Sequence, residues 1–461
     1  MTFIYTVHPE ILSIIFENTK AMTADETQFP GEVSAEKKHG IAFEVIACAV
    51  CTYFREVAFA TPSLWTTTRV HGASDPENIV QRLSHAGNFW LDIRIDLAAK
   101  DDQMDAAKLQ LIIDSILQHS LRWRSLCIGY GYERRDHPVV GQICSAPAPG
   151  LKRLSLTVDD VDKADGTLIN RAANLPHIFK DGTPELELIR LRGFSIHLFR
   201  PPLSSMVTLH LDQTRSIHIQ YSTLADMLTA SPHLANLSIH SDILAQGNWP
   251  DRQKAIRLPA LRSLRLFSNS GEGFPGMLKI INAPRLEFLT LKGLREGDME
   301  LVWAMQKTRF DGLKSLSLVD SDMSTWMCVR MFETFRQITS LSAVYASAGK
   351  MEGMVLNHLS HGKTSGQDGV QFVPWPKLTT VCLGSDLWVN GREVTRAFIA
   401  ARREDGHPIS TVIFKGSAEQ MEDILSARTE AGVGVEIKFC SQNIIWPEKS
   451  SDVDQEDTLF R

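Results

Sequence analysis

Three motifs in the sequence contain residue types and spacings that could do chemistry. The first combines His8-Pro-Glu10 with Cys48 and Cys51, which form a Cys-x-x-Cys pair. One histidine and two thiolates can hold a zinc ion that activates water while a glutamate shuttles the proton, as in zinc-dependent deamination of a nucleobase. However, Ala47 replaces the proline expected before the first cysteine, and both cysteines fall on an apolar helical pattern. Buried helix cysteines are the favoured interpretation, and a zinc-dependent deaminase is a remote alternative.

The other two motifs are glycine-rich loops that could bind phosphate groups. The segment GEGFPG, residues 271–276, matches the G-x-G-x-x-G pattern of dinucleotide-binding turns. Pro275 would disturb the amides that face the phosphates, and no acidic residue follows in the required context. The segment HGKTSG has Asn357 where a P-loop needs its first glycine. The sequence therefore predicts no catalytic residues, no cofactor and no metal site.

Composition restricts the classes of partner and the location of the protein. A net charge of -6 and a pI of about 6.2 give no overall attraction to nucleic acid or to anionic membranes. No segment approaches the roughly 18 apolar residues of a membrane span, and the features of a signal peptide are missing at the N-terminus. The seven cysteines are odd in number and mostly isolated, which does not suit a disulfide framework. We expect an intracellular protein, cytoplasmic or nuclear, that binds neither nucleic acid nor membrane.

A repeated pattern predicts the elements that would position any site. The chain has 461 residues, too many for one ordinary core, so it should form several domains or a repeat array. The pattern L-x-x-L-x-L, with apolar substitutes, starts at Trp123, Leu151, Leu186, Met206, Leu234, Leu261, Leu286, Leu313, Ile338, Leu378 and Ile409. From Leu234 to Ile338 successive starts lie 27, 25, 27 and 25 residues apart. Leucine-rich repeats have periods of roughly 20 to 29 residues.

Stacking of these copies predicts an α/β fold. The last two apolar residues of each copy lie on one side of a strand, and a single strand cannot bury that side alone. The copies should therefore form a parallel sheet covered by helices. Helical apolar spacing occurs between copies, in segments 221–230, 298–307, 326–335, 391–404 and 418–430. We predict a leucine-rich-repeat solenoid over residues 71–446, with a parallel sheet and outer helices, and a disordered acidic tail over residues 447–461.

An apolar helix is also predicted close to the start of the chain, ahead of the first copy. In segment 8–20, Pro9 and Glu10 suit a helix N-terminus. The residues that should form one apolar face of this helix are Ile11, Leu12, Ile15 and Phe16. A second helix is predicted from the helical spacing of Phe43, Ile46, Ala47, Val50, Phe54 and Val57. Two helices of this size bury too little surface to be stable alone.

Residues 1–70 resemble an F-box module. Many members of that family begin with a helix of the type Leu-Pro-x-Glu-Ile-Leu and continue into a helix that ends Val-Cys-x-x-Trp-Arg. A large fungal F-box-like group then closes with Thr-Pro-x-Leu-Trp. Here these elements read VHPEIL, VCTYFRE and TPSLW. A small all-α F-box-like module followed by leucine-rich repeats is similar to the common F-box/LRR arrangement.

The resemblance implies a non-enzymatic adaptor. In the family the module docks on a Skp-type adaptor, which bridges to a cullin ubiquitin ligase, and the repeats bind a protein substrate. The adaptor-binding residues implied by position are Val7, Pro9, Ile11, Leu12, Val50, Cys51, Phe54 and Trp65. The alternative is a protein-binding repeat scaffold with no ubiquitin-ligase link, in which Ile11, Leu12 and Ile15 only cap the first repeat.

The outward residues of the predicted strands provide a candidate substrate-binding face. Basic and aromatic side chains, expected to be exposed, gather there: Arg190, Arg192, His210, His240, Arg265, Phe267, Phe288 and Lys292. Arginine and aromatic residues dominate the energetics of protein interfaces. We therefore expect an acidic or phosphorylated peptide or protein ligand, with a solvated face that binds nothing as the alternative.

Overall fold

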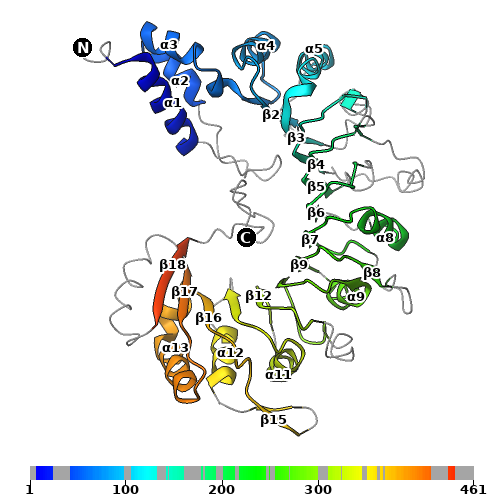
Figure 1. Cartoon of the computed structure of the whole chain (residues 1–461), viewed down its shortest axis with the longest axis vertical. Helices are drawn as coiled ribbons and strands as arrows, with labels where there is room; N and C mark the ends of the chain where they lie inside the picture. Colours follow the sequence, from blue (N-terminus) through cyan, green and yellow to red (C-terminus); the bar gives the residue numbers. More distant parts are fainter. Residues whose placement is uncertain are drawn as a thin grey trace. The chain divides into compact units, whose positions relative to one another are not determined.

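The fold is α/β, with one large parallel sheet. A computed structural model describes residues 7–23, 42–97, 105–131, 142–143, 145–159, 178–179, 182–193, 201–212, 218–244, 249, 255–268, 270–299, 310–322, 324–344, 350–360, 364–366, 369–416 and 435–441. Fourteen strands form the sheet, in the order that they have in the chain (Figure 1). The described residues fall into two compact units, unit 1 up to Asp212 and unit 2 from His218 to Ser441.

Unit 1 begins with helices and continues into the first strands of the sheet. The opening helices are α1 (Pro9–Thr23), α2 (Phe43–Val50), α3 (Thr52–Phe59) and the short 3-10 helix η2 (Pro62–Trp65). The strands are β1 (Thr67–Val70), β2 (Leu91–Leu97), β3 (Trp123–Gly131), β4 (Arg153–Asp159), β5 (Leu188–Gly193) and β6 (Thr208–Asp212). Helix α4 (Pro76–His85) precedes β2, and α5 (Ala106–Leu117) and η3 (Ser120–Arg122) precede β3. Figure 1 shows α4 and α5 next to each other on one side of the strands.

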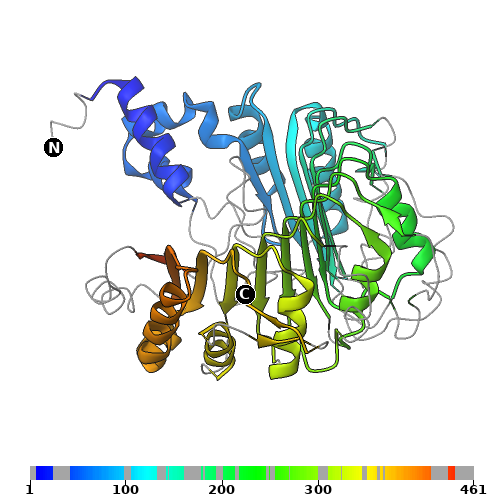
Figure 2. The ribbon, with the colours of Figure 1, turned by 60° about the horizontal axis from the view of Figure 1, so that its bottom comes forward.

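Unit 2 alternates strands and helices, and its helices lie on one side of the strands (Figures 1 and 2). Its sheet strands are β7 (Asn236–His240), β9 (Ser263–Phe267), β11 (Phe288–Lys292), β12 (Ser315–Val319), β13 (Ser340–Val344), β16 (Thr380–Gly384), β17 (Thr411–Gly416) and β18 (Glu436–Ser441). Its helices are α8 (Tyr221–Thr229), α9 (Gly273–Ile280), α11 (Thr325–Thr334), α12 (Lys350–Ser360) and α13 (Ser385–Glu404). Two small ladders join β8 (Ile256–Arg257) to β10 (Ile281–Asn282) and β14 (Thr364–Ser365) to β15 (Gln371–Phe372).

Each copy of the sequence pattern forms one strand, which confirms the predicted parallel sheet. The first leucine of a copy closes a tight turn, as where the amide of Leu286 donates to the carbonyl of Ala283 at 3.1 Å. The next amide reaches the preceding copy, so Glu287 donates to the carbonyl of Arg262 at 2.9 Å. Parallel register then places Leu289 opposite Leu264, and both side chains are fully buried. The eleven copies account for eleven of the fourteen strands, and β1, β2 and β18 were not predicted.

Three of the helices predicted between the copies are present in the structure. Segments 221–230, 326–335 and 391–404 correspond to α8, α11 and α13. Segment 418–430, most of segment 298–307 and the predicted tail, 447–461, lie outside the described residues. Among the described helices, none is both long and apolar enough to cross a bilayer.

The second predicted helix is wrong in one respect, because the chain breaks it at Cys51. This residue is extended, with φ -161° and ψ 171°, and its Sγ accepts a hydrogen bond from the Phe54 amide at 3.4 Å. The break lets the Phe16 ring contact both Phe43 and Phe54, with ring centroids 5.8 and 5.2 Å apart. An unbroken helix would separate those two rings by about 16 Å along its axis, because each residue adds about 1.5 Å. Burial of Phe16 therefore requires the two helices.

Candidate functional site

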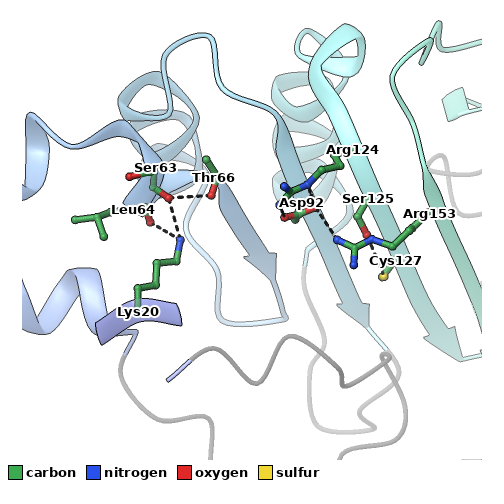
Figure 3. Close-up of polar contacts among 9 residues, drawn as sticks. All are labelled: Lys20, Ser63, Leu64, Thr66, Asp92, Arg124, Ser125, Cys127 and Arg153. Carbon is green, nitrogen blue, oxygen red and sulfur yellow. Dashed lines mark hydrogen bonds and ion pairs between the residues drawn. The ribbon is translucent and has the colours of Figure 1, made fainter. Parts of the chain in front are cut away.

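Helix α1 is fixed to the rest of unit 1 by one side only. Leu12 and Phe16, one turn apart, are buried on that side. The Lys20 ammonium group donates to the backbone carbonyls of Leu64 and Ser63, at 2.8 and 3.3 Å (Figure 3). These contacts give α1 a closed internal core and a defined orientation against η2.

The remaining side of α1 and the adjacent helix α2 carry an exposed apolar surface, which we call the module surface. It consists of Ile11, Ile14, Ile15, Val45, Ile46 and Val50, each between 48 and 56% exposed. Single exposed apolar residues are ordinary, but six of them on two short neighbouring helices indicate an interaction site. We had predicted a single apolar face on α1, and the helix instead has a buried strip and an exposed one.

The eight implied adaptor-binding residues do not lie on one surface. Pro9, Ile11 and Val50 are exposed, and Val7, Cys51 and Phe54 are half-buried. Leu12 and Trp65 are buried inside unit 1, so their side chains serve internal packing. Motif matching also missed Ile14, Ile15, Val45 and Ile46. Segment 11–16 contains more apolar residues than fit on one buried face of a helix, and this excess could have indicated the exposed ones.

Trp65 belongs to a joint between the opening helices and α4. Its ring lies 5.5 Å from the Arg82 guanidinium group and 5.1 Å from the His85 ring. His85 in turn stacks on Phe59 at 4.5 Å. Arg82 forms an ion pair with Glu44 of α2, and both side chains are largely buried. Burial lowers the pKa of Arg82 to about 10. The joint therefore connects three elements of the opening helical region to the first helix beside the sheet.

The predicted substrate-binding residues of unit 1 share one face of the sheet. Register places Arg190 beside His210 and Arg192 beside Asp212. The Asp212 carboxylate lies 3.7 Å from Arg190 and 3.5 Å from Arg192. Arg190 and His210 are nevertheless buried, so the expectation of exposed basic groups is wrong for both. They occupy the middle of three outward positions, where side chains on strands about 4.8 Å apart shield one another.

The predicted residues of unit 2 also align, and they form a mixed aromatic and basic group. Phe267 stands in register between His240 and Lys292, with the His240 ring at 4.5 Å and the Lys292 ammonium at 5.8 Å from its own ring. Burial lowers the pKa of Lys292. Phe288 is half-buried at the other end of β11, in register with Ser263, whereas Arg265 between these rows is buried, again against expectation.

A basic cluster that the sequence did not predict lies on strands β2 to β4 (Figure 3). The Asp92 carboxylate accepts hydrogen bonds from Arg124, with Nε at 3.2 Å, and from Arg153 at 3.4 Å. Strand β2 is not a copy of the leucine pattern, so Asp92 had no predicted position. The alternation of LDIRIDL was the signal that could have identified this strand.

The motifs first considered for chemistry are occupied by local contacts. His8 pairs with Glu10 at 2.9 Å, and the Cys51 thiol caps α3. In the described part of the chain, no group of three or more histidine, cysteine, aspartate or glutamate residues could hold a metal ion. The remote deaminase alternative therefore gains no support from the positions of these residues.

The segment GEGFPG forms the start of helix α9, and backbone amides at this helix start have acceptors within the chain. The Ser270 amide donates to the Asp242 carboxylate at 2.8 Å, and the Gly273 amide donates to the Ser268 hydroxyl at 3.2 Å. A dinucleotide-binding turn presents such amides to phosphate groups. These two amides are therefore paired within the chain.

Neither a protein-family model nor a curated protein matches this sequence.

Proposed function

We propose that this chain is the substrate-recognition adaptor of an SCF-type cullin ubiquitin ligase. Helices α1 to α3 and η2 act as an F-box-like module that docks on a Skp-type adaptor. The strands and helices that follow act as a leucine-rich-repeat solenoid that binds a protein substrate. The observation that carries this proposal is the module surface, which stays exposed although the core beneath it is closed by Leu12 and Phe16.

The module surface is large enough to drive association. Fully burying one valine or isoleucine contributes about 1.5 to 3 kcal/mol. Six side chains that are each about half exposed correspond to roughly three full side chains, or on the order of 5 to 9 kcal/mol before the costs of association. The motif residues are consistent with a folded module, since Cys51 caps α3 and the TPSLW segment forms η2 with Trp65 in the joint.

The role of the chain in this proposal is to bring two partners together. The module surface and strands β1 to β6 belong to one compact unit, and the buried Glu44–Arg82 pair fixes α2 to α4. A substrate held on this unit would stay at a restricted distance from a bound adaptor. Such restriction raises the effective concentration of the reacting groups, while other subunits perform ubiquitin transfer.

Co-purification with a Skp-type adaptor tests the proposal. We expect the wild-type chain to form a complex and the double variant Ile11→Asp, Ile15→Asp to lose it. Leu111→Asp is the matched control, because Leu111 is equally exposed on α5 of the same unit. Circular dichroism should be unchanged in both variants. Absence of a wild-type complex, or a complex that survives the double substitution, would overturn the proposal.

The scaffold alternative is favoured by the joint. Trp65, Arg82 and Glu44 bury the opening helices against α4, as a cap on the end of a sheet would. A scaffold predicts that the same double variant keeps every partner of the wild-type chain, and that no Skp-type adaptor co-purifies. The two functions therefore give opposite results in one experiment.

A further inference from the structure

We propose that the amino-terminal edge of strands β2, β3 and β4 binds an acidic protein segment that carries apolar side chains. The residues of this edge surface are Phe89, Trp90, Leu121, Arg122, Arg124, Lys152 and Arg153. All lie just before or at the first residues of three adjacent parallel strands. The proposal concerns a different surface from the module surface, and it stands whether or not the chain binds a Skp-type adaptor.

The apolar part of the edge surface consists of three large side chains. Phe89, Trp90 and Leu121 are 50 to 59% exposed. Leu91 is in register with Trp123, so the segments that carry these side chains run next to each other. The Arg122 guanidinium group also donates to the Phe89 carbonyl at 3.4 Å, which links the two segments. Exposed aromatic side chains at such a position are typical anchors of protein interfaces.

The Trp90 ring packs against the backbone at Gly150. A methyl group added at Gly150 would lie 2.3 Å from ring atom Cζ3 of Trp90, so the ring lies directly against this glycine. One part of the ring is held by the chain, and about half of the residue remains exposed. A side chain that is already immobilised loses little conformational entropy when a partner covers it. Packing against Gly150 therefore restricts the Trp90 side chain before a partner binds.

The polar part of the edge surface presents cations to a partner. In the Asp92 cluster the carboxylate is only 14% exposed, whereas the side chains of Arg124 and Arg153 are 44 and 24% exposed (Figure 3). The carboxylate lies beneath and orients the two guanidinium groups. Guanidinium groups pair with carboxylates through planar, charge-assisted hydrogen bonds.

The local charge favours an acidic partner. The edge carries four basic residues, Arg122, Arg124, Lys152 and Arg153, against three acidic ones, Asp92, Glu185 and Glu187. Glu185 lies 4.0 Å from Lys152, and the Glu187 amide donates to the Lys152 carbonyl at 3.0 Å. Four minus three gives a local charge of +1, whereas the whole chain carries -6. An extended polyanion such as single-stranded DNA would be disfavoured by the net negative charge of the whole chain. A short acidic peptide would meet only the edge, and its apolar residues would cover the aromatic side chains.

Fluorescence anisotropy with the full chain tests this proposal. The probe is the fluorescein-labelled peptide Asp-Glu-Asp-Leu-Phe-Asp-Glu-Asp. Its first control carries Asn and Gln in place of the acids, and its second carries Gly-Ser in place of Leu-Phe. We expect the probe to bind in a salt-dependent way and both control peptides to bind at least tenfold more weakly, since each tenfold step is about 1.4 kcal/mol.

Variants locate the binding to the edge surface. Trp90→Ala should weaken binding about 30-fold, as expected for a central aromatic anchor. Gly150→Ala keeps the tryptophan but displaces its ring, so it should weaken binding about tenfold without removing a contact group. Arg124→Gln with Arg153→Gln should weaken binding and reduce its salt dependence. Trp326→Ala is the matched control, because Trp326 is comparably exposed on α11 of unit 2.

Three results would overturn the proposal. The first is equal affinity for the neutral peptide, which would remove the role of charge. The second is unchanged affinity of both Trp90→Ala and Gly150→Ala, which would place the peptide elsewhere. The third is binding of a single-stranded DNA of equal charge in preference to the peptide, which would identify a different class of partner.

Discussion

Helix α1 gives the sharpest test of the structure, because two residues of the same apolar segment should behave oppositely on substitution. Leu12 is 4% exposed and Ile15 is 48% exposed. Replacing a buried leucine by alanine costs about 2 to 5 kcal/mol, through lost burial and the cavity that remains. Ile15→Ala should cost less than about 1 kcal/mol, because half of the side chain is already in water and alanine favours the helix by a few tenths.

Hydrogen exchange followed by mass spectrometry measures this difference in α1 itself. A loss of about 3 kcal/mol corresponds to a roughly 150-fold larger opening constant for the α1 amides. We expect Leu12→Ala to accelerate exchange across Pro9–Thr23 by that order and Ile15→Ala to change it less than about fivefold. Equal acceleration by both variants, or none by Leu12→Ala, would refute the assignment of a buried and an exposed strip.

Three further predictions concern charges, each measured as the urea midpoint of unfolding of the full chain. Glu44→Gln leaves Arg82 buried without its ion-pair partner and should cost about 3 to 5 kcal/mol, whereas Glu436→Gln, in an exposed pair, should cost less than about 1 kcal/mol. Glu287 accepts hydrogen bonds from two basic side chains that lower its pKa, so its charged form stabilises the fold. Glu287→Gln should therefore destabilise the fold at pH 7. The stability difference between variant and wild type should vanish as the pH falls below the lowered pKa. Burial raises the pKa of Asp298, so its charged form opposes folding. Asp298→Asn should therefore stabilise the fold at pH 7. This gain should disappear at pH 3, where the carboxyl is protonated in both the folded and the unfolded state. A pH dependence of the opposite sign for either carboxyl variant would contradict these assignments.

The sheet could be predicted because each strand is constrained by its own sequence. In a copy such as the one at Leu286, the first leucine closes the turn and the next two point into the core. These roles depend on local alternation and on an identical neighbour, so they repeat with the sequence. Strands β1, β2 and β18 lack a leucine at the first position of the pattern, and they were missed. The alternation of LDIRIDL could have identified β2, whereas the four residues of β1 are too few to distinguish that strand from a loop.

The exposure of outward side chains could not be predicted in the same way. Arg190 and Arg192 occupy equivalent outward positions two residues apart, yet Arg190 is buried and Arg192 is not. The difference comes from side chains on neighbouring strands, and the sequence alone does not show which of them lie next to each arginine. The Asp92 cluster was missed for the same reason, since it needs three strands in register. Sequence therefore predicts which residues face outward better than it predicts which of them a partner can reach.

In the opening helices, the residues that stabilise the fold are different from the residues that are exposed for binding. The residues that define the F-box resemblance most clearly, Leu12, Cys51 and Trp65, are used for a core contact, a helix cap and the joint with α4. The exposed residues Ile14, Ile15 and Ile46 stand largely outside the motif. Substitutions that preserve the motif would then preserve the fold while leaving the docking surface free to change. Under the proposed docking function, the exposed isoleucines and valines would decide which partner binds, and substitutions there should alter partner choice without altering stability.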